Sequence, residues 1–240
     1  MRPAHAHVAS AGRTLRGKAR LRNEDAYLDC PQRRCWAVAD GMGGHRAGDV
    51  ASQWIISSLA SLPGDGSLDQ RVEAMRRCLR LLDEQMGRTL QPTAGGIMGS
   101  TVVALLVEGN RAACLWVGDS RCYLWRGRRL YQLSRDHSRL QQLMDAQQLS
   151  LEQACAHPDA RALTRAIGGR RPLSMDVLEL STRPGDVFLL CSDGLYQGLS
   201  HGSLGNALSL GTPRWAVDQL FAEALRGAAR DDLTAVVVQP

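Results

Sequence analysis

The sequence predicts an α+β fold: a four-layer α-β-β-α sandwich in which helices flank two antiparallel sheets. Short apolar runs of strand length recur along most of the chain, and two amphipathic helical stretches separate the early runs from the later ones. Several runs are apolar at nearly every position, as in strands covered on both faces: 102–107, 187–190 and 235–238. No repeat or Pro/Ser-rich linker divides the 240 residues, so we expect one domain over 1–240.

The N-terminal third is predicted to form a hairpin followed by two helices. Strands at 26–30 and 35–39 are separated by the turn-forming residues 31–34. Residues 49–62 place apolar side chains at helical spacing, and a longer helix is expected from about 68 to 90.

The middle of the chain predicts four closely spaced strands, at 100–107, 111–117, 121–125 and 129–133. Because short Gly-containing turns join them, we expect an antiparallel meander.

The remaining elements are a flap and the last strands of the sandwich. Residues 136–172 are more polar and predict a small flap outside the sheets, in which Asp136-His137-Ser138 forms an N-cap network for the next helix. The chain then ends with two strands, a helix and a closing strand, at 175–180, 187–192, 214–226 and 233–238.

Composition excludes several classes of protein. The net charge is +5, but the basic residues are spread along the chain, only Lys18 is a lysine, and aromatic residues make up 5%, so we expect no nucleic-acid surface. No apolar run has the length of a membrane helix, and the first ten residues lack the apolar stretch of a secretory signal. Seven scattered cysteines without a C-x-x-C pair fit a reducing compartment. We expect a cytoplasmic monomer that binds no membrane.

Acidic residues gather where predicted strands begin or end. They are Glu24 and Asp25, Asp40, Asp119, Asp193, and Asp231 and Asp232. A single Asp-Gly beside a strand is ordinary turn chemistry, but five acidic positions of this kind in one chain are harder to explain by turns alone.

Convergence of these strand ends would crowd several carboxylates into one volume. Two unit charges 4 Å apart repel by about 4 kcal/mol at an effective dielectric constant near 20. Such a cluster must bind cations or protons, and an all-oxygen set selects hard ions such as Mg²⁺ or Mn²⁺. Two of these ions side by side commonly serve in-line attack of a hydroxide on phosphorus, so the spacing points to hydrolysis of a phosphate ester.

Seven sequence blocks carry a resemblance to a known family. In chain order they are GKARLRNEDA (17–26), DGMGGH (40–45), GST (99–101), GDSR (118–121), DHS (136–138), CSDGL (191–195) and DDLT (231–234). Their order resembles that of the PPM family, the metal-dependent type 2C serine/threonine protein phosphatases, over about residues 8 to 239. Each block alone is weakly specific, and the specificity comes from seven blocks in register.

The resemblance implies a site for two Mn²⁺ or Mg²⁺ ions. Asp40 would bridge both ions, and the carbonyl of Gly41 would join one of them. Asp193 and Asp231 would complete the shell of one ion, and Glu24 would reach the other through water.

Other residues would support this site. Asp119 resembles the ligand of a third, weaker ion shared with Asp193. Asp25 and Asp232 would lie behind the ligands and orient waters and side chains. Arg20 would grip the substrate phosphate, because its planar fork suits two phosphate oxygens.

Two positions depart from the family pattern. Met42 stands where animal members have a His proposed as general acid, so the proton for the leaving group would come from water or from no positioned group. His45 lies close in sequence, but we interpret it as a structural residue of the loop rather than as the general acid. Asp232 stands where Asn is common, and its extra charge would either tighten metal binding or shift the water network.

The resemblance implies hydrolysis of phosphoserine and phosphothreonine by attack of a metal-bridging hydroxide. Phosphorylated proteins would be the substrates, and a bacterial Ser/Thr kinase would be the opposing partner. The length and short flap also resemble PppA-type phosphatases, which counter a threonine kinase in the regulation of type VI secretion. The alternative is a catalytically inactive phosphatase-fold scaffold or regulatory binding protein; a two-metal nuclease is disfavoured by the missing basic-aromatic surface.

Overall fold

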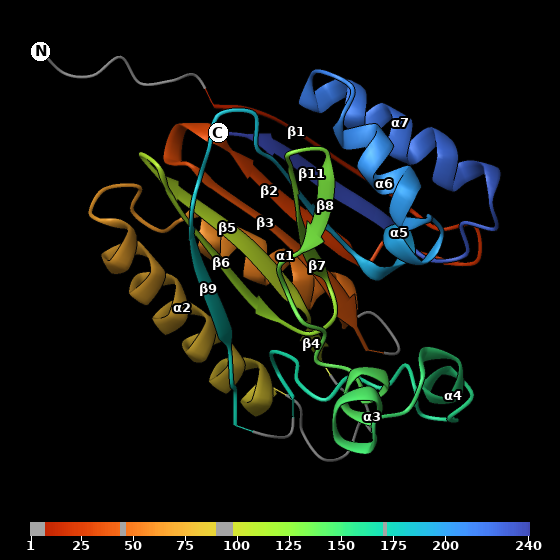
Figure 1. The fold of residues 1–240 in the computed structure, drawn as a ribbon. Helices are drawn as coiled ribbons and strands as arrows, with labels where there is room; N and C mark the ends of the chain where they lie inside the picture. Colours follow the sequence, from red (N-terminus) through yellow and green to blue (C-terminus); the bar gives the residue numbers. More distant parts are fainter. Residues whose placement is uncertain (1–7, 44–46, 90–97, 170–171) are drawn as a thin grey trace, which may run out of the picture.

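A computed structural model describes residues 8–43, 47–89, 98–169 and 172–240. Two antiparallel sheets pack face to face, and helices cover the outer face of each (Figure 1). The first sheet has the strand order β1 (Ala9–Leu15), β11 (Leu233–Gln239), β10 (Val187–Cys191), β7 (Arg121–Arg126) and β8 (Arg129–Gln132).

The second sheet contains the early strands of the chain. Its order is β2 (Asp25–Cys30), β3 (Cys35–Met42), β5 (Val102–Glu108), β6 (Arg111–Val117) and β9 (Asp176–Ser181), with β4 (Gly99–Ser100) paired to β3. A 3₁₀ turn, Pro31–Arg33, joins β2 to β3, where the sequence predicts a hairpin connection.

Helices form the two outer layers. Those that cover the second sheet are α1 (Gly48–Ala60) and α2 (Leu68–Thr89). Those that cover the first sheet are α5 (Asp193–Gln197), α6 (His201–Leu208) and α7 (Pro213–Arg226). The predicted α-β-β-α sandwich is confirmed.

Alternating strand residues explain why these strands are apolar at nearly every position. On β3, Trp36 and Val38 pack between the sheets, while Ala37 and Ala39 pack toward α1 and α2. Because each strand is covered on both faces, few of its positions are left for polar side chains. The alternation of the two sets along the strand follows from the two-residue period of a β-strand.

The predicted four-stranded meander is wrong. The hairpin of β5 and β6 belongs to the second sheet, whereas the hairpin of β7 and β8 belongs to the first. The chain crosses between the sheets at Gly118, whose φ of +102° suits glycine. Because strands that are apolar on both faces do not indicate which sheet they join, the sequence could not predict this crossing. The crossing places Asp119 at the end of the sandwich.

Three elements were not anticipated from the sequence. Strand β1 lacks a strong apolar alternation, and its Gly12 lies against Tyr27, whose ring a Cβ would meet at 2.4 Å. The short helices α5 and α6 occupy 5 and 8 residues, too few for a clear periodic pattern.

The flap lies outside the sheets, below them in Figure 1. It contains α3 (Arg139–Gln147) and α4 (Leu151–Cys155). The Ser138 hydroxyl caps α3 by accepting a hydrogen bond from the Gln141 N–H at 3.2 Å, as the predicted N-cap requires. An isolated bridge between Ser100 and Ile167 ties the end of the flap to the second sheet.

Two further observations concern composition. All seven cysteines are free thiols in the structure. In the described ranges, no helix combines the length and the hydropathy needed to cross a bilayer.

Candidate active site

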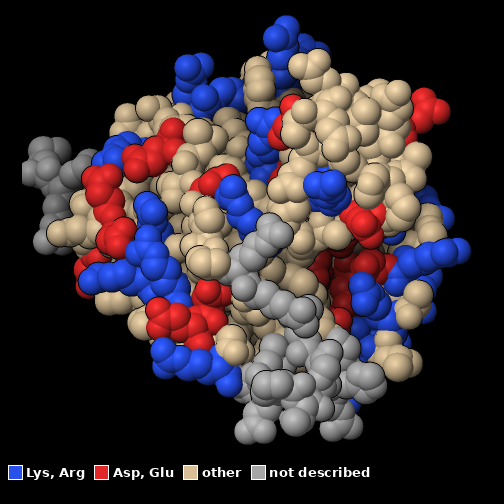
Figure 2. All heavy atoms as spheres, turned by 90° about the horizontal axis from the view of Figure 1, so that it is seen from below, with Lys and Arg blue, Asp and Glu red and all other residues tan. Residues whose placement is uncertain are grey.

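The acidic strand ends converge in one cleft of about 620 Å³ at the end of the sandwich. The residues that line it are Arg20, Glu24, Asp40, Gly41, Met42, Gly43, Thr101, Asp119, Arg161, Leu163, Asp193 and Asp231. Figure 2 shows acidic side chains inside a hollow of this face, with basic side chains beside it. Every residue assigned to metal in the sequence analysis lies here, whereas Thr101, Arg161 and Leu163 were not anticipated.

Asp40 is held at the end of β3 by the neighbouring strand segment. Its N–H donates to the Thr101 hydroxyl at 3.1 Å, and its carbonyl accepts from the Thr101 N–H at 2.9 Å and from the Ser100 hydroxyl at 2.9 Å. The Gly99-Ser100-Thr101 block therefore fixes the backbone of Asp40 and leaves its carboxylate free to face the cleft.

Gly41 sits where no side chain fits. A Cβ at this position would lie 2.0 Å from the carbonyl oxygen of Gly48. The Gly41 N–H donates to the Glu24 carbonyl at 3.0 Å, which ties β3 to the loop before β2.

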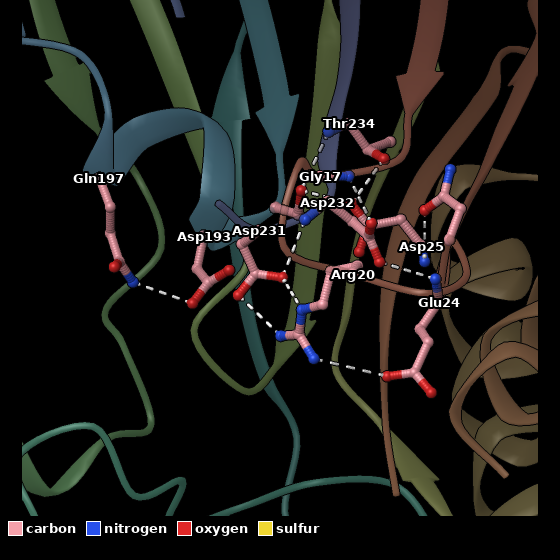
Figure 3. Close-up of polar contacts among 11 residues, drawn as sticks. Gly17, Arg20, Glu24, Asp25, Asp193, Gln197, Asp231, Asp232 and Thr234 are labelled. Carbon is pink, nitrogen blue, oxygen red and sulfur yellow. Dashed lines mark hydrogen bonds and ion pairs between the residues drawn. The ribbon is translucent and has the colours of Figure 1, made fainter. Parts of the chain in front are cut away.

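Asp193 is the first residue of α5, directly after the buried strand β10. Its carboxylate accepts a hydrogen bond from Gln197 at 2.9 Å, one turn along the helix (Figure 3). A Cβ at Gly194 would lie 2.1 Å from the carbonyl oxygen of Asp232, so glycine permits α5 to pack against the segment that carries Asp231.

Arg20 and Glu24 belong to a loop that folds onto the end of the chain. The N–H groups of Lys18 and Ala19 donate to the carbonyls of Ala229 and Arg230 at 2.8 and 3.1 Å. The Arg20 guanidinium makes two hydrogen bonds to Asp231, at 2.7 and 2.8 Å, and lies 3.8 Å from Glu24. Figure 3 shows Arg20 pointing between the two carboxylates.

Asp25 and Asp232 are buried behind the cleft and do not line it. Asp25 accepts hydrogen bonds from the hydroxyls of Ser192 and Thr234, at 2.7 and 2.6 Å. Asp232 accepts from two backbone N–H groups, those of Gly17 and Glu24, each at 2.8 Å. Asp232 thus fastens both ends of the loop that carries Arg20.

The crowded carboxyls raise one another's affinity for protons. Burial, reinforced by the charges of Asp25, Asp193 and Asp119, raises the pKa of Asp40 well above its usual range. Burial and then the charge of Asp193 raise the pKa of Asp119 to about 7. Burial is also the main cause of the raised pKa of Glu24 and of Asp193. The cleft therefore favours bound positive charge.

Residues 15–236 match the family model described as protein phosphatase 2C. The chain belongs to this family. The resemblance drawn from the seven sequence blocks is thereby confirmed.

Curated proteins similar to this chain include protein phosphatases of bacteria. Serine/threonine protein phosphatase PstP of Mycobacterium tuberculosis is 37% identical over 231 residues, which cover 95% of this chain but only 44% of that protein. Serine/threonine phosphatase stp of Listeria monocytogenes is 31% identical over 236 residues, which cover 95% of this chain and 94% of the relative.

Solved structures of the family superimpose along nearly the whole chain. PppA, described as a key regulatory component of T6SS in Pseudomonas aeruginosa, has a TM-score of 0.88 at 40% identity and covers 98% of both chains. The catalytic domain of PstP in complex with two manganese ions has a TM-score of 0.83 at 34% identity and covers 97% of both chains.

The donor chemistry of the 2C-family cleft fits hard divalent ions. Its potential ligands are carboxylates and the Gly41 carbonyl, all oxygen donors of the kind that Mn²⁺ and Mg²⁺ prefer. Across the described ranges, no group of three His, Cys, Asp or Glu side chains is already gathered closely enough to hold a metal ion. Both oxygens of Asp231 accept hydrogen bonds from the Arg20 guanidinium instead.

Proposed function

We propose that this chain is a metal-dependent serine/threonine protein phosphatase that hydrolyses phosphoserine and phosphothreonine. The observation that carries the proposal is the convergence of Asp40, Asp119, Asp193 and Asp231 in one open cleft with Arg20 beside them. The names of the curated relatives and the two manganese ions of the PstP domain support it.

The cleft residues have separate roles in this proposal. Asp40 would hold both ions, and the Gly41 carbonyl would join one of them. Asp193 and Asp231 would complete the shell of one ion, and Glu24 would reach the other through water. When bound, the ions lower the pKa of water for attack on phosphorus and offset the charge of the phosphoryl oxygens. Asp119 and Asp193 would share a third, weaker site, and their common position in the cleft supports this.

Arg20 binds the substrate phosphate after exchanging partners. Its guanidinium already makes two parallel hydrogen bonds to a carboxylate, the geometry with which it would grip two phosphate oxygens. Met42 lines the cleft and donates no proton, and none of the described lining residues is a histidine. The leaving oxygen therefore takes its proton from water. His45 lies outside the described residues.

An inactive scaffold fits the site less well. Burial and then neighbouring carboxylates raise the pKa of Asp40, Asp119 and Asp193, and a protein that only binds a partner gains nothing from keeping such an unfavourable cluster. The likeness to PppA, described as a key regulatory component of T6SS, supports a role in T6SS regulation. We further propose that a bacterial Ser/Thr kinase is the opposing partner. We further propose a cytoplasmic, monomeric protein formed of the single domain 1–240 that uses Mn²⁺ or Mg²⁺.

Asp40→Asn tests this function. The neutral amide ligates poorly and cannot offset two dications, so hydrolysis of a phosphothreonine peptide with saturating Mn²⁺ should fall by several orders of magnitude. Asp65→Asn, at an exposed position that does not line the cleft, is the matched control and should keep full activity. Circular dichroism checks that both variants fold. Wild-type turnover by folded Asp40→Asn would overturn the proposal.

A further inference from the structure

A second hollow continues from the active-site cleft along the flap. It has a volume of about 690 Å³, and Met42 and Leu163 line both it and the cleft, so the two are continuous. Its walls come from the first turns of α3, from the end of the flap and from the segment that leads into β9. A peptide whose phosphorylated residue sits in the cleft can therefore extend into this groove.

Arginines give the groove a charge opposite to that of the cleft. Arg139 and Arg165 line the groove, and Arg161 lines the adjoining wall of the cleft. Asp159 is the single carboxylate among the described lining residues of the groove. The cleft next to it is lined by five carboxylates, so the boundary between the two lies at Met42 and Leu163.

Two of these arginines have guanidinium groups available to a ligand. Arg139 is half-buried at the start of α3, and the one hydrogen bond of its guanidinium to a described residue is a long one, 3.4 Å to Gln142. Arg161 is exposed, and its side chain makes no hydrogen bond or ion pair with any other part of the chain that the structure describes.

The third arginine is held in place by an ion pair. The Arg165 guanidinium lies 3.1 Å from the Asp176 carboxylate, and both side chains are partly exposed. His137 is 6% exposed; its Nδ1 accepts from the Gly118 N–H at 3.1 Å, so its Nε2 carries the proton and donates to Asp176. Because the ion pair with Asp176 restrains Arg165, less side-chain entropy is lost when it meets a ligand.

The floor between the arginines is small and apolar. Besides Met42 and Leu163, it includes Ala162, Ala166 and Leu173. An extended peptide backbone can lie on such a floor, and the apolar floor residues do not compete with the arginines for the acidic side chains of the peptide.

We propose that this groove binds an acidic segment of the phosphoprotein substrate, next to the phosphorylated residue. The inference rests on the proposed phosphatase function and adds a substrate class to it: phosphothreonine or phosphoserine flanked by Asp or Glu. The carboxylates of that segment pair with Arg139 and Arg161, while Arg165, whose charge is balanced by Asp176, borders the groove. A basic segment would be repelled by Arg139 and Arg161, and among the described lining residues of the groove it could pair only with Asp159.

Three phosphothreonine peptides that differ only in their flanks test the proposal. One carries acidic residues, one neutral and one basic, and para-nitrophenyl phosphate serves as a substrate too small to reach the groove. We expect kcat/KM to be about ten-fold higher for the acidic than for the neutral peptide, because each exposed charge pair contributes a factor of about two to five. Raising the NaCl concentration should shrink this preference.

Arg139→Gln and Arg161→Gln test the residues. Each should lower the acidic-to-neutral ratio by about two- to five-fold, and the double variant should remove it. Arg139 lies outside the cleft, so Arg139→Gln should leave turnover of the aryl phosphate unchanged. Arg129→Gln is the matched control, since Arg129 lies at the β7–β8 turn, at the opposite end of the molecule from the flap in Figure 1. Equal rates on the three peptides, or a preference that survives the double variant, would overturn the proposal.

A binding measurement separates this inference from the proposed function. Fluorescence anisotropy of a labelled acidic peptide with a non-hydrolysable phosphonate should show tighter binding to the wild type than to the double variant. If no substrate is hydrolysed but this difference remains, the phosphatase function fails and the groove stands. If the aryl phosphate is hydrolysed and the difference is missing, the groove is wrong and the phosphatase function stands.

Discussion

The Arg20 guanidinium and the Asp231 carboxylate form a bidentate ion pair, with Nε 2.7 Å from Oδ1 and Nη2 2.8 Å from Oδ2 (Figure 3). Both groups have other partners in the proposed reaction: Arg20 has the substrate phosphate, and Asp231 has a metal ion. The pair therefore competes with both. Because the Arg20 side chain is 45% exposed, water screens the pair, and its contribution to stability is small.

Removing Arg20 should weaken phosphate binding without weakening metal binding. We expect Arg20→Ala to raise KM for a phosphothreonine peptide by about 10- to 100-fold, because a charge-assisted hydrogen-bond pair is lost. Arg20→Lys should recover part of this, since an ammonium cannot form the fork.

Calorimetric titration with Mn²⁺ supplies the second readout for Arg20. Freeing Asp231 should leave the Mn²⁺ affinity equal or make it slightly higher. Unchanged KM and kcat in both variants would reduce Arg20 to a surface residue, and a large loss of Mn²⁺ affinity would contradict its assignment to phosphate.

Asp232→Asn should loosen the loop that carries Arg20 and Glu24. The N–H groups of Gly17 and Glu24 each need an oxygen acceptor at 2.8 Å, and Asn offers only one. Its NH₂ group would face the other donor, at a cost of about 1–3 kcal/mol for the unsatisfied buried group. We expect a lower melting temperature, a higher peptide KM and faster hydrogen exchange at these two amides.

The same hydrogen bonds bear on the two alternatives that the sequence left open for Asp232. They add a third role, a fastening of the backbone, and both alternatives stay predictions. Asp218→Asn, on the exposed face of α7, serves as the control. Retention of full amide protection at Gly17 and Glu24 in Asp232→Asn would show that one acceptor suffices.

Much of the site was predictable because its residues stand beside strands. Asp40 and Asp193 each follow an apolar run of strand length and precede a glycine, a pattern that the sequence shows directly. Arg161 and Leu163 reach the cleft only because the flap folds back onto Ser100 and Ser138, and such tertiary contacts leave no periodic pattern. The two hydrogen bonds of Asp232 span more than 200 residues of sequence, so no local sequence pattern could predict them either.

The metal-free protein should lose stability as the pH rises from about 4 to 7. The pKa of Asp119 and of Asp25 rises from 3.8 to about 7 on folding, mainly through burial. Between these values the folded state binds more protons than the unfolded state, so the free energy of unfolding falls with increasing pH. Thermal unfolding in EDTA should therefore give a higher melting temperature at pH 5 than at pH 8.

Two comparisons check the cause of this slope. Asp119→Asn, which mimics the protonated group, should flatten it, whereas Asp65→Asn should not. Saturating Mn²⁺ should raise the melting temperature most at high pH, where the ligands are deprotonated. A melting temperature in EDTA that rises between pH 5 and pH 8 would contradict the raised pKa values.

Met42 predicts a steep dependence of rate on the leaving group. A positioned general acid typically contributes 10²- to 10⁴-fold, and a thioether supplies none of it. Aryl phosphates with good leaving groups should hide the deficit, while a threonine alkoxide should expose it. We therefore expect kcat/KM across a series of phosphate esters to fall steeply as the pKa of the leaving alcohol rises.

Met42→His tests whether the missing donor is the cause. Met42 lines both the cleft and the groove, so a histidine there can reach the leaving oxygen of a bound peptide. The variant should accelerate the phosphothreonine peptide more than para-nitrophenyl phosphate, and Met42→Gln, similar in size but without an acidic proton, is the matched control. A flat dependence in the wild type, with chemistry shown to limit the rate, would mean that another group already donates the proton; loss of the flat profile in a His45→Gln variant would then identify His45 as that group.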